Sequence, residues 1–269
     1  MKNNKYKIVV FTDLKDSVDS TIKSAISLAK MINGEIELFH VKKILDVVNK
    51  ESQLSAMRNI SSKYVNAENK LKEIAKTFAK DSNISFSYTL AIGNLKNEIS
   101  LFLDEKKPDI IVLEKKKSLI FNKPKVNLIQ FILKNHSGPI FIADDQKSLV
   151  LDNEMSLGLL DDVESFNKFK FSQDLFHHTK KPIKSFKILQ DANTTGKDVN
   201  QNKNTIEYVF EKNDNAIQSI SNFILKSNLN LICLNRDNIK KDNINKSYTT
   251  PLKINAIIEN LSVPVLLMA

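Results

Sequence analysis

Short apolar segments alternate with amphipathic helical segments along the first half of this 269-residue chain. Strands are predicted at residues 7–12, 35–41, 84–91, 110–113 and 139–143, and helices at residues 18–33, 54–78, 95–106 and 126–135. Gly34 is predicted to end the first helix. The strand at 110–113 is apolar at every position, which is typical of a parallel strand buried on both faces. The alternation predicts an α/β fold with a doubly wound parallel sheet and right-handed crossovers.

The second half of the sequence repeats the first. The matching segments are residues 159–165 with 11–17, 183–190 with 35–42, 216–220 with 95–99, 230–234 with 109–113, and 262–265 with 137–140. The second copy is degenerate, because a polar stretch at residues 191–204 replaces the long helix of the first copy. We therefore predict two domains, residues 1–146 and 149–269, each a five-stranded parallel sheet flanked by helices.

The last strand of each copy is short and apolar. These strands are predicted at Ile140 to Ala143 and at Val265 to Met268. We expect them to pair with each other, because the pairing hides two sheet edges that would otherwise be exposed. The two halves would then form an internal pseudo-dimer within one chain.

Composition narrows the classes of function. The single cysteine, Cys233, lies in an apolar run and excludes a disulfide framework. No segment approaches the roughly 18 apolar residues of a membrane span, and none has the features of a signal peptide, so we expect a cytoplasmic protein. The net charge of +9 belongs mostly to residues 1–148, which hold 25 basic and 17 acidic residues. Aromatic residues do not alternate with these charges, which disfavours binding to nucleic acid.

Five local motifs occur in the order of one known family. They are Asp13 at the end of the first strand, Leu38-Phe39-His40-Val41 at the end of the second, Gly93-Asn94 before the third helix, Lys107-Pro108-Asp109-Ile110 before the fourth strand, and Ser137-Gly138-Pro139-Ile140 before the fifth. Over nearly the whole chain this pattern resembles the universal stress protein family in its tandem two-domain form. The resemblance implies two Rossmann-like units of the adenine nucleotide alpha hydrolase-like type.

The resemblance also implies a role in stress tolerance, through binding of nucleotide or partner proteins. Nucleotide-binding members carry a G-x2-G-x9-G-[ST] signature after strand four, where glycines let the backbone approach the phosphates. Residues 114–125 and 235–250 of this chain contain no glycine, and the whole chain has only five. We therefore expect no cofactor, with ATP or another adenine nucleotide as the alternative.

Some residues of a nucleotide or anion site remain. They are Asp13, Val41, Gly93, Lys115, Lys116 and Lys117. Lysine ammonium groups can hold phosphate as point charges without a glycine loop. Each residue also has a structural interpretation: Asp13 as a helix cap or turn residue, Gly93 as a turn with positive φ, and Lys115 to Lys117 as a solvated loop.

No motif indicates catalysis or a metal. The adjacent His177 and His178 would point about 100° apart on a helix and could not share one ion. No nucleophile–base pattern appears, so we expect no enzyme, with weak nucleotide hydrolysis as the remote alternative. The preferred interpretation is a stress-response protein with a regulatory or scaffolding role, an unknown protein partner and a possible homo-oligomeric state. The alternative is a nucleotide or anion sensor that uses the first domain only.

Overall fold

The computed structural model of the chain describes residues 5–14, 18–43, 53–115, 128–145, 147–151, 155–160, 166, 171–180, 182–189, 204–211, 216–235, 258 and 260–268. The first half contains β1 (Tyr6–Phe11), α1 (Val18–Ile32), β2 (Gly34–Lys42), α2 (Gln53–Ser82), β3 (Phe86–Ile92), α3 (Leu95–Lys106), β4 (Ile110–Glu114), α5 (Leu128–Asn135) and β5 (Ile140–Ala143). The second half contains β6 (Leu157–Leu160), α7 (Ser172–His177), β7 (Ile183–Leu189), β8 (Thr205–Glu211), α8 (Ala216–Lys226), β9 (Leu231–Asn235) and β10 (Val265–Met268).

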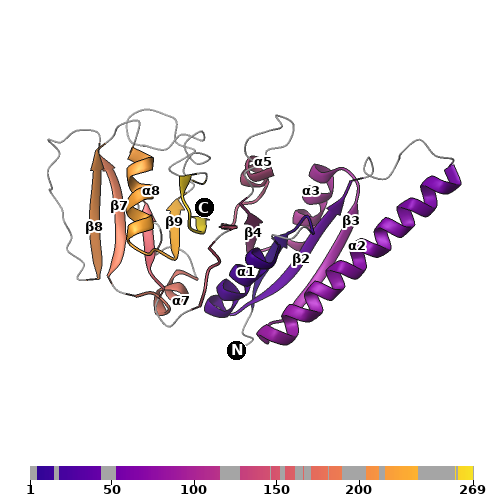
Figure 1. Ribbon diagram of the computed structural model, residues 1–269, viewed down its shortest axis with the longest axis horizontal. Helices are drawn as coiled ribbons and strands as arrows, with labels where there is room; N and C mark the ends of the chain where they lie inside the picture. Colours follow the sequence, from indigo (N-terminus) through magenta and orange to yellow (C-terminus); the bar gives the residue numbers. More distant parts are fainter. Residues whose placement is uncertain are drawn as a thin grey trace.

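The ten described strands form one twisted sheet in the order β3-β2-β1-β4-β5-β10-β9-β6-β7-β8 (Figure 1). Neighbouring strands within each half are parallel. The exception is the central pair, in which β5 and β10 run antiparallel with Phe141 opposite Leu266. This confirms the predicted α/β fold and the predicted pairing of the two last strands.

Two apolar cores cover the two faces of the sheet. One core packs alternate strand residues against α1, α2 and α7, and the other packs the remaining strand residues against helices α3, α5 and α8. Both cores contain residues of both halves: Phe141 and Leu266 belong to the first, and Ile142 and Val265 to the second. The halves therefore share their apolar interior across the central pair of strands.

The cross-strand register corrects the alignment between the two copies. Ile8 lies opposite Ile110 in the first half, and Leu157 lies opposite Leu231 in the second. Leu159 is therefore the counterpart of Val10, with which it shares a core, and not of Phe11 as the sequence alignment placed it. A shift of one residue moves every side chain of a strand to the other face of the sheet. The sequence repeat does not show which face of the sheet a side chain packs against. The burial of the side chains shows this, and it therefore fixes the register of the second copy.

The first helix ends one residue earlier than glycine placement predicts. Asn33, with φ of 56°, is the residue in the left-handed region after α1, and Gly34 already belongs to β2. Asparagine tolerates this backbone region better than most side chains. A Cβ on Gly34 would lie 2.7 Å from Cδ1 of Ile8, so this glycine permits close packing of β2 against β1.

Candidate functional site

The predicted site residues lie at the carboxyl ends of four neighbouring strands. Asp13 follows β1, Val41 is near the end of β2, Gly93 follows β3, and Lys115 follows β4. The strand order reverses between β1 and β4, which is where ligands bind in open α/β sheets. Asp13, Val41 and Gly93 therefore share one edge of the first half.

The segment after β1 is held in a tight turn. The amide of Thr12 donates to the carbonyl of Phe39 (3.0 Å), and Oγ1 of Thr12 accepts from the amide of Leu14 (3.0 Å). Leu14 has φ of 60°, and its carbonyl accepts a hydrogen bond from Nζ of Lys70 on α2 (2.6 Å). These bonds fix the backbone on both sides of Asp13 and leave its side chain exposed at the switch point.

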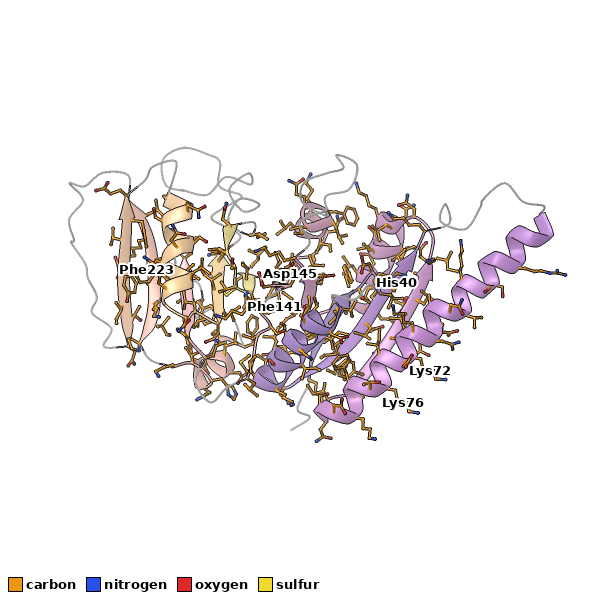
Figure 2. The ribbon with its side chains drawn as sticks, in the orientation of Figure 1. His40, Lys72, Lys76, Phe141, Asp145 and Phe223 are labelled. Atoms are coloured by element: carbon orange, nitrogen blue, oxygen red, sulfur yellow. The ribbon has the colours of Figure 1, made fainter. Side chains whose placement is uncertain are left out.

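His40 supports the same turn from β2. Its Nδ1 lies 2.8 Å from the carbonyl oxygen of Thr12, and the side chain is buried. Burial is the main cause that lowers the pKa of His40; Lys42 lowers it further, while the bond to Thr12 and the charge of Asp13 oppose the shift. The neutral ring donates its Nδ1 proton to the Thr12 carbonyl and thereby holds the turn that presents Asp13. Figure 2 labels His40 in the first half of the chain.

Acidification is expected to destabilise the protein through His40. Because its pKa is lowered in the folded state, the unfolded chain binds the proton at higher pH than the folded chain does. The stability contribution of the neutral ring is complete above about pH 6.5 and is lost as the pH falls below that value towards the folded pKa. Urea denaturation between pH 7.5 and 5 should show this slope, and His40→Gln should reduce it. An unchanged slope in His40→Gln would assign the effect to other groups.

Gly93 is closely packed against Glu98 and does not have a left-handed backbone. Its φ lies outside the left-handed region, so the interpretation as a turn with positive φ is wrong. A Cβ at this position would overlap Oε1 of Glu98 and lie 2.9 Å from its Cδ. Asn94 caps α3 by accepting from the amides of Lys96 (3.1 Å) and Asn97 (3.4 Å), which brings Glu98, in the first turn of the helix, back over Gly93. The carboxyl group of Glu98 therefore lies at the end of β3, beside the predicted nucleotide position.

Gly93→Ala is expected to lower the free energy of unfolding by at most about 1 kcal/mol, because the new methyl group displaces only the flexible end of the Glu98 side chain. The double variant Gly93→Ala/Glu98→Ala should recover most of this loss, since the clash is removed. Thermal denaturation of the two single variants and the double variant measures the coupling. Additive effects of the two substitutions would show that Glu98 is not the residue that requires glycine at 93.

Lys115 has a buried partner directly after the next strand, β5. Its Nζ lies 3.4 Å from Oδ2 of Asp144 and also donates to the carbonyl of Leu261 in the second half. The other carboxylate oxygen of Asp144 accepts from the amide of Lys147 (2.9 Å). Both charged side chains are buried, with exposed fractions of 10% for Lys115 and 3% for Asp144. The ammonium group that the sequence assigned to a phosphate site thus connects the two halves of the chain.

Several predicted features lie outside the described residues. They are Lys116 and Lys117, the Asp161-Asp162 counterpart of Asp13, the glycine-free segment 236–250, and the polar stretch 191–203. The domain limits at 146 and 149 stay a prediction. Among the described residues no group of three His, Cys, Asp or Glu side chains could hold a metal ion. No helix in the described part of the chain is long and apolar enough to cross a membrane.

Four residues that the structure places in this region were not predicted from the sequence. They are Thr12, Lys70, Glu98 and Asp144. Glu98 carried a weak signal, because an acidic residue follows the helix-capping Asn94 within one turn. Lys70 carried none, since it is one of many lysines on α2. Its contact with Leu14 bridges 56 residues of sequence and depends on how α2 crosses the sheet.

The reversed strand order and the turn that presents Asp13 define a Rossmann-like α/β protein with a site edge at the carboxyl ends of its parallel strands. Comparison with protein families gives the particular class. Residues 6–137 are a universal stress protein domain, since the model of the universal stress protein family matches them. The match of residues 6–137 to this family supports a role in the response to stress. No curated protein matches the chain significantly.

Solved structures extend the similarity to the whole chain. A universal stress protein from Archaeoglobus fulgidus covers 98% of this chain and 98% of its own, with 13% identity and a TM-score of 0.68. A putative universal stress protein from Pseudomonas aeruginosa covers 98% of this chain and 93% of its own, with 10% identity and a TM-score of 0.56. At these identities the similarity concerns the fold. A tandem arrangement of two units is compatible with both matches.

Proposed function

We propose that this chain is a non-catalytic stress-response protein that acts through protein contacts and does not bind ATP in the way of the glycine-signature members. The observation that carries this proposal is the buried pair of Lys115 and Asp144. Lys115 is the described member of the lysine cluster at the end of β4, and its charge is already neutralised there. Phosphate binding by this ammonium group would require breaking the pair.

Two further observations support the proposal. Residues 114–125 contain no glycine, so a cradle of closely approaching backbone amides is not available in this segment. The carboxyl group of Glu98 lies beside Gly93, where it would repel a phosphate group that approached the end of β3. Both features act against a triphosphate at this edge.

Thermal unfolding with ATP, AMP, cyclic AMP and cyclic di-AMP tests the proposal, together with mass spectrometry of the native purified protein. We expect no shift in the unfolding temperature and no nucleotide in the native spectrum. A ligand at a hundred times its dissociation constant would add about 2.7 kcal/mol, which is a shift of several degrees for a chain of this size. Recovery of one nucleotide per chain would overturn the proposal.

The alternative function is a nucleotide or anion sensor in the first half. Its support is the exposed carboxylate of Asp13 at the switch point, with Val41 and Gly93 at the ends of the adjacent strands. If a nucleotide does bind, Asp13→Asn and Lys116→Ala/Lys117→Ala should each weaken it by about tenfold. Lys72→Ala/Lys76→Ala removes the same charge from the exposed face of α2 and is the matched control (Figure 2).

A further inference from the structure

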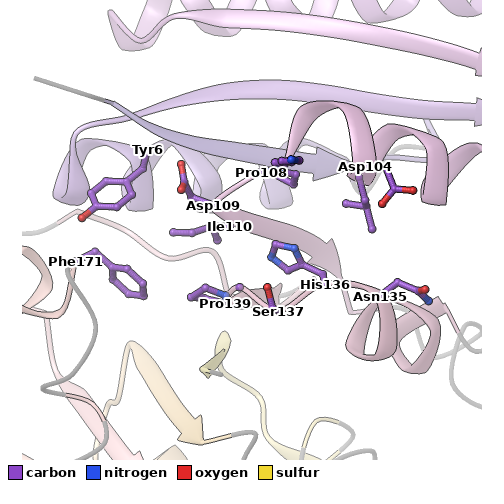
Figure 3. A pocket seen from close by; sticks show the side chains of 13 residues that line it. Tyr6, Asp104, Pro108, Asp109, Ile110, Asn135, His136, Ser137, Pro139 and Phe171 are labelled. Atoms are coloured by element: carbon purple, nitrogen blue, oxygen red, sulfur yellow. The ribbon is translucent and has the colours of Figure 1, made fainter. Parts of the chain in front are cut away.

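A cleft of about 530 Å³ lies at the edge of the first half where its parallel strands begin (Figure 3). Tyr6 is the first residue of β1, Ile110 is the first of β4, and Pro139 directly precedes β5. The cleft is therefore at the amino ends of these strands, on the opposite edge from Asp13 and Gly93. Its volume is within the range that small-molecule sites occupy in proteins.

The walls of the cleft are fixed by short-range structure. Asp109 exchanges two hydrogen bonds with Lys7: its carboxylate accepts from the Lys7 amide (2.8 Å), and its own amide donates to the Lys7 carbonyl (2.9 Å). Pro108 and Pro139 restrict the backbone on either side. The Asp109 carboxylate is thus held in place at the mouth of the cleft before any ligand binds.

One end of the cleft is aromatic and is built from both halves of the chain. The rings of Tyr6 and Phe171 meet edge to face, with centroids 6.2 Å apart and an interplanar angle of 85°. Burial raises the pKa of the Tyr6 hydroxyl, and the charges of Asp174 and Asp109 raise it further. Two carboxylates therefore lie near enough to this hydroxyl to affect its pKa, in a chain whose net charge is +9.

The charged side chains that line the cleft also carry more negative than positive charge. Asp104 and Asp109 contribute two negative charges to the lining, and Lys107 contributes one positive charge. Ile110, Pro139 and Phe171 contribute apolar surface to the same lining (Figure 3). A carboxylate attracts an organic cation through charge, and the aromatic rings beside it can pack against the apolar body of the same molecule. An anion would meet repulsion at the same place.

We propose that this cleft binds a small primary amine with an aromatic body. The ammonium group would lie at the Asp109 carboxylate, and the apolar body would lie against Tyr6, Phe171 and Pro139. The site is independent of the proposed function, because it shares no residue with the edge that carries Asp13.

Saturation-transfer NMR with the full chain tests this inference, with 2-phenylethylamine as the probe and 2-phenylethanol and phenylacetate as analogues of matched size. We expect the amine to bind at least about tenfold more tightly than the alcohol, and phenylacetate to bind least. Asp109→Asn keeps an oxygen that can accept from the Lys7 amide but removes the charge, and it should abolish the preference for the amine. Glu73→Gln removes an equal charge from the exposed surface of α2 and should leave the preference unchanged.

Phe171→Leu tests the aromatic end separately and should weaken the amine and the alcohol by similar factors. If Asp109→Asn does not fold, Asp104→Asn takes its place, because it removes the other carboxylate charge of the cleft lining from an exposed position. The inference is overturned if the amine and the alcohol bind equally, if Asp109→Asn retains the preference for the amine, or if no probe shows saturation transfer at millimolar concentration.

Discussion

Lys115→Met is expected to lower the free energy of unfolding by about 3–5 kcal/mol, because it leaves the buried carboxylate of Asp144 without its ion-pair partner. The carbonyl of Leu261 loses its donor at the same time. Since the chain contains no tryptophan, urea denaturation followed by far-UV circular dichroism is the suitable measurement.

Two further variants test whether the unpaired carboxylate of Asp144 causes this loss of stability. Lys115→Met/Asp144→Leu removes both charges and should be more stable than Lys115→Met, because no buried charge remains unpaired. Lys72→Met on the exposed face of α2 should change the stability by less than about 0.5 kcal/mol. A loss below about 1 kcal/mol in Lys115→Met would mean that the ammonium group contributes little, and it would make this lysine available for an anion after all.

Phe141→Ala is expected to cost about 3–5 kcal/mol and to destabilise both halves at once. Phe141 is fully buried in the middle of the sheet, opposite Leu266 of the second half (Figure 2). Because each apolar core contains residues from both halves, the chain should unfold in one cooperative transition. The urea midpoint should fall while the transition remains single.

The control for this variant is Leu101→Ala, which truncates a side chain that is 65% exposed on α3 and should have little effect. Hydrogen exchange measured by mass spectrometry gives the second readout. Amides of β1 and β9 should lose protection together in Phe141→Ala. Two separate transitions, with only the first half destabilised, would contradict a shared interior.

The strands of the first half, and their alternation with helices along the chain, were predictable because the apolar period and the turn residues report them directly. The strand predicted at 110–113 was observed at Ile110–Glu114, and the central pair of strands was predicted from the need to cover two exposed edges. The register of the second copy was wrong by one residue, because a run such as Leu157–Leu160 is buried on both faces and gives no alternation to follow.

The site was less predictable, because its contacts join distant parts of the sequence. Lys115 reaches Asp144 across 29 residues and Leu261 across 146, so a local pattern of positive charge could not identify its partners. Glycine is ambiguous for a different reason. At position 93 it removes a methyl group from the path of Glu98, and composition does not distinguish this need from a need for positive φ.

Because β5 and β10 belong to one chain, their antiparallel pairing does not depend on the concentration of the protein. Two separate chains joined by such an edge would dissociate on dilution, whereas two halves of one chain stay at an effective concentration set by the connection between them, about millimolar for a short flexible one. The second half can therefore serve as a permanent cover for the β5 edge. Its degeneracy in sequence is compatible with that duty, because strand pairing depends on backbone groups and apolar side chains.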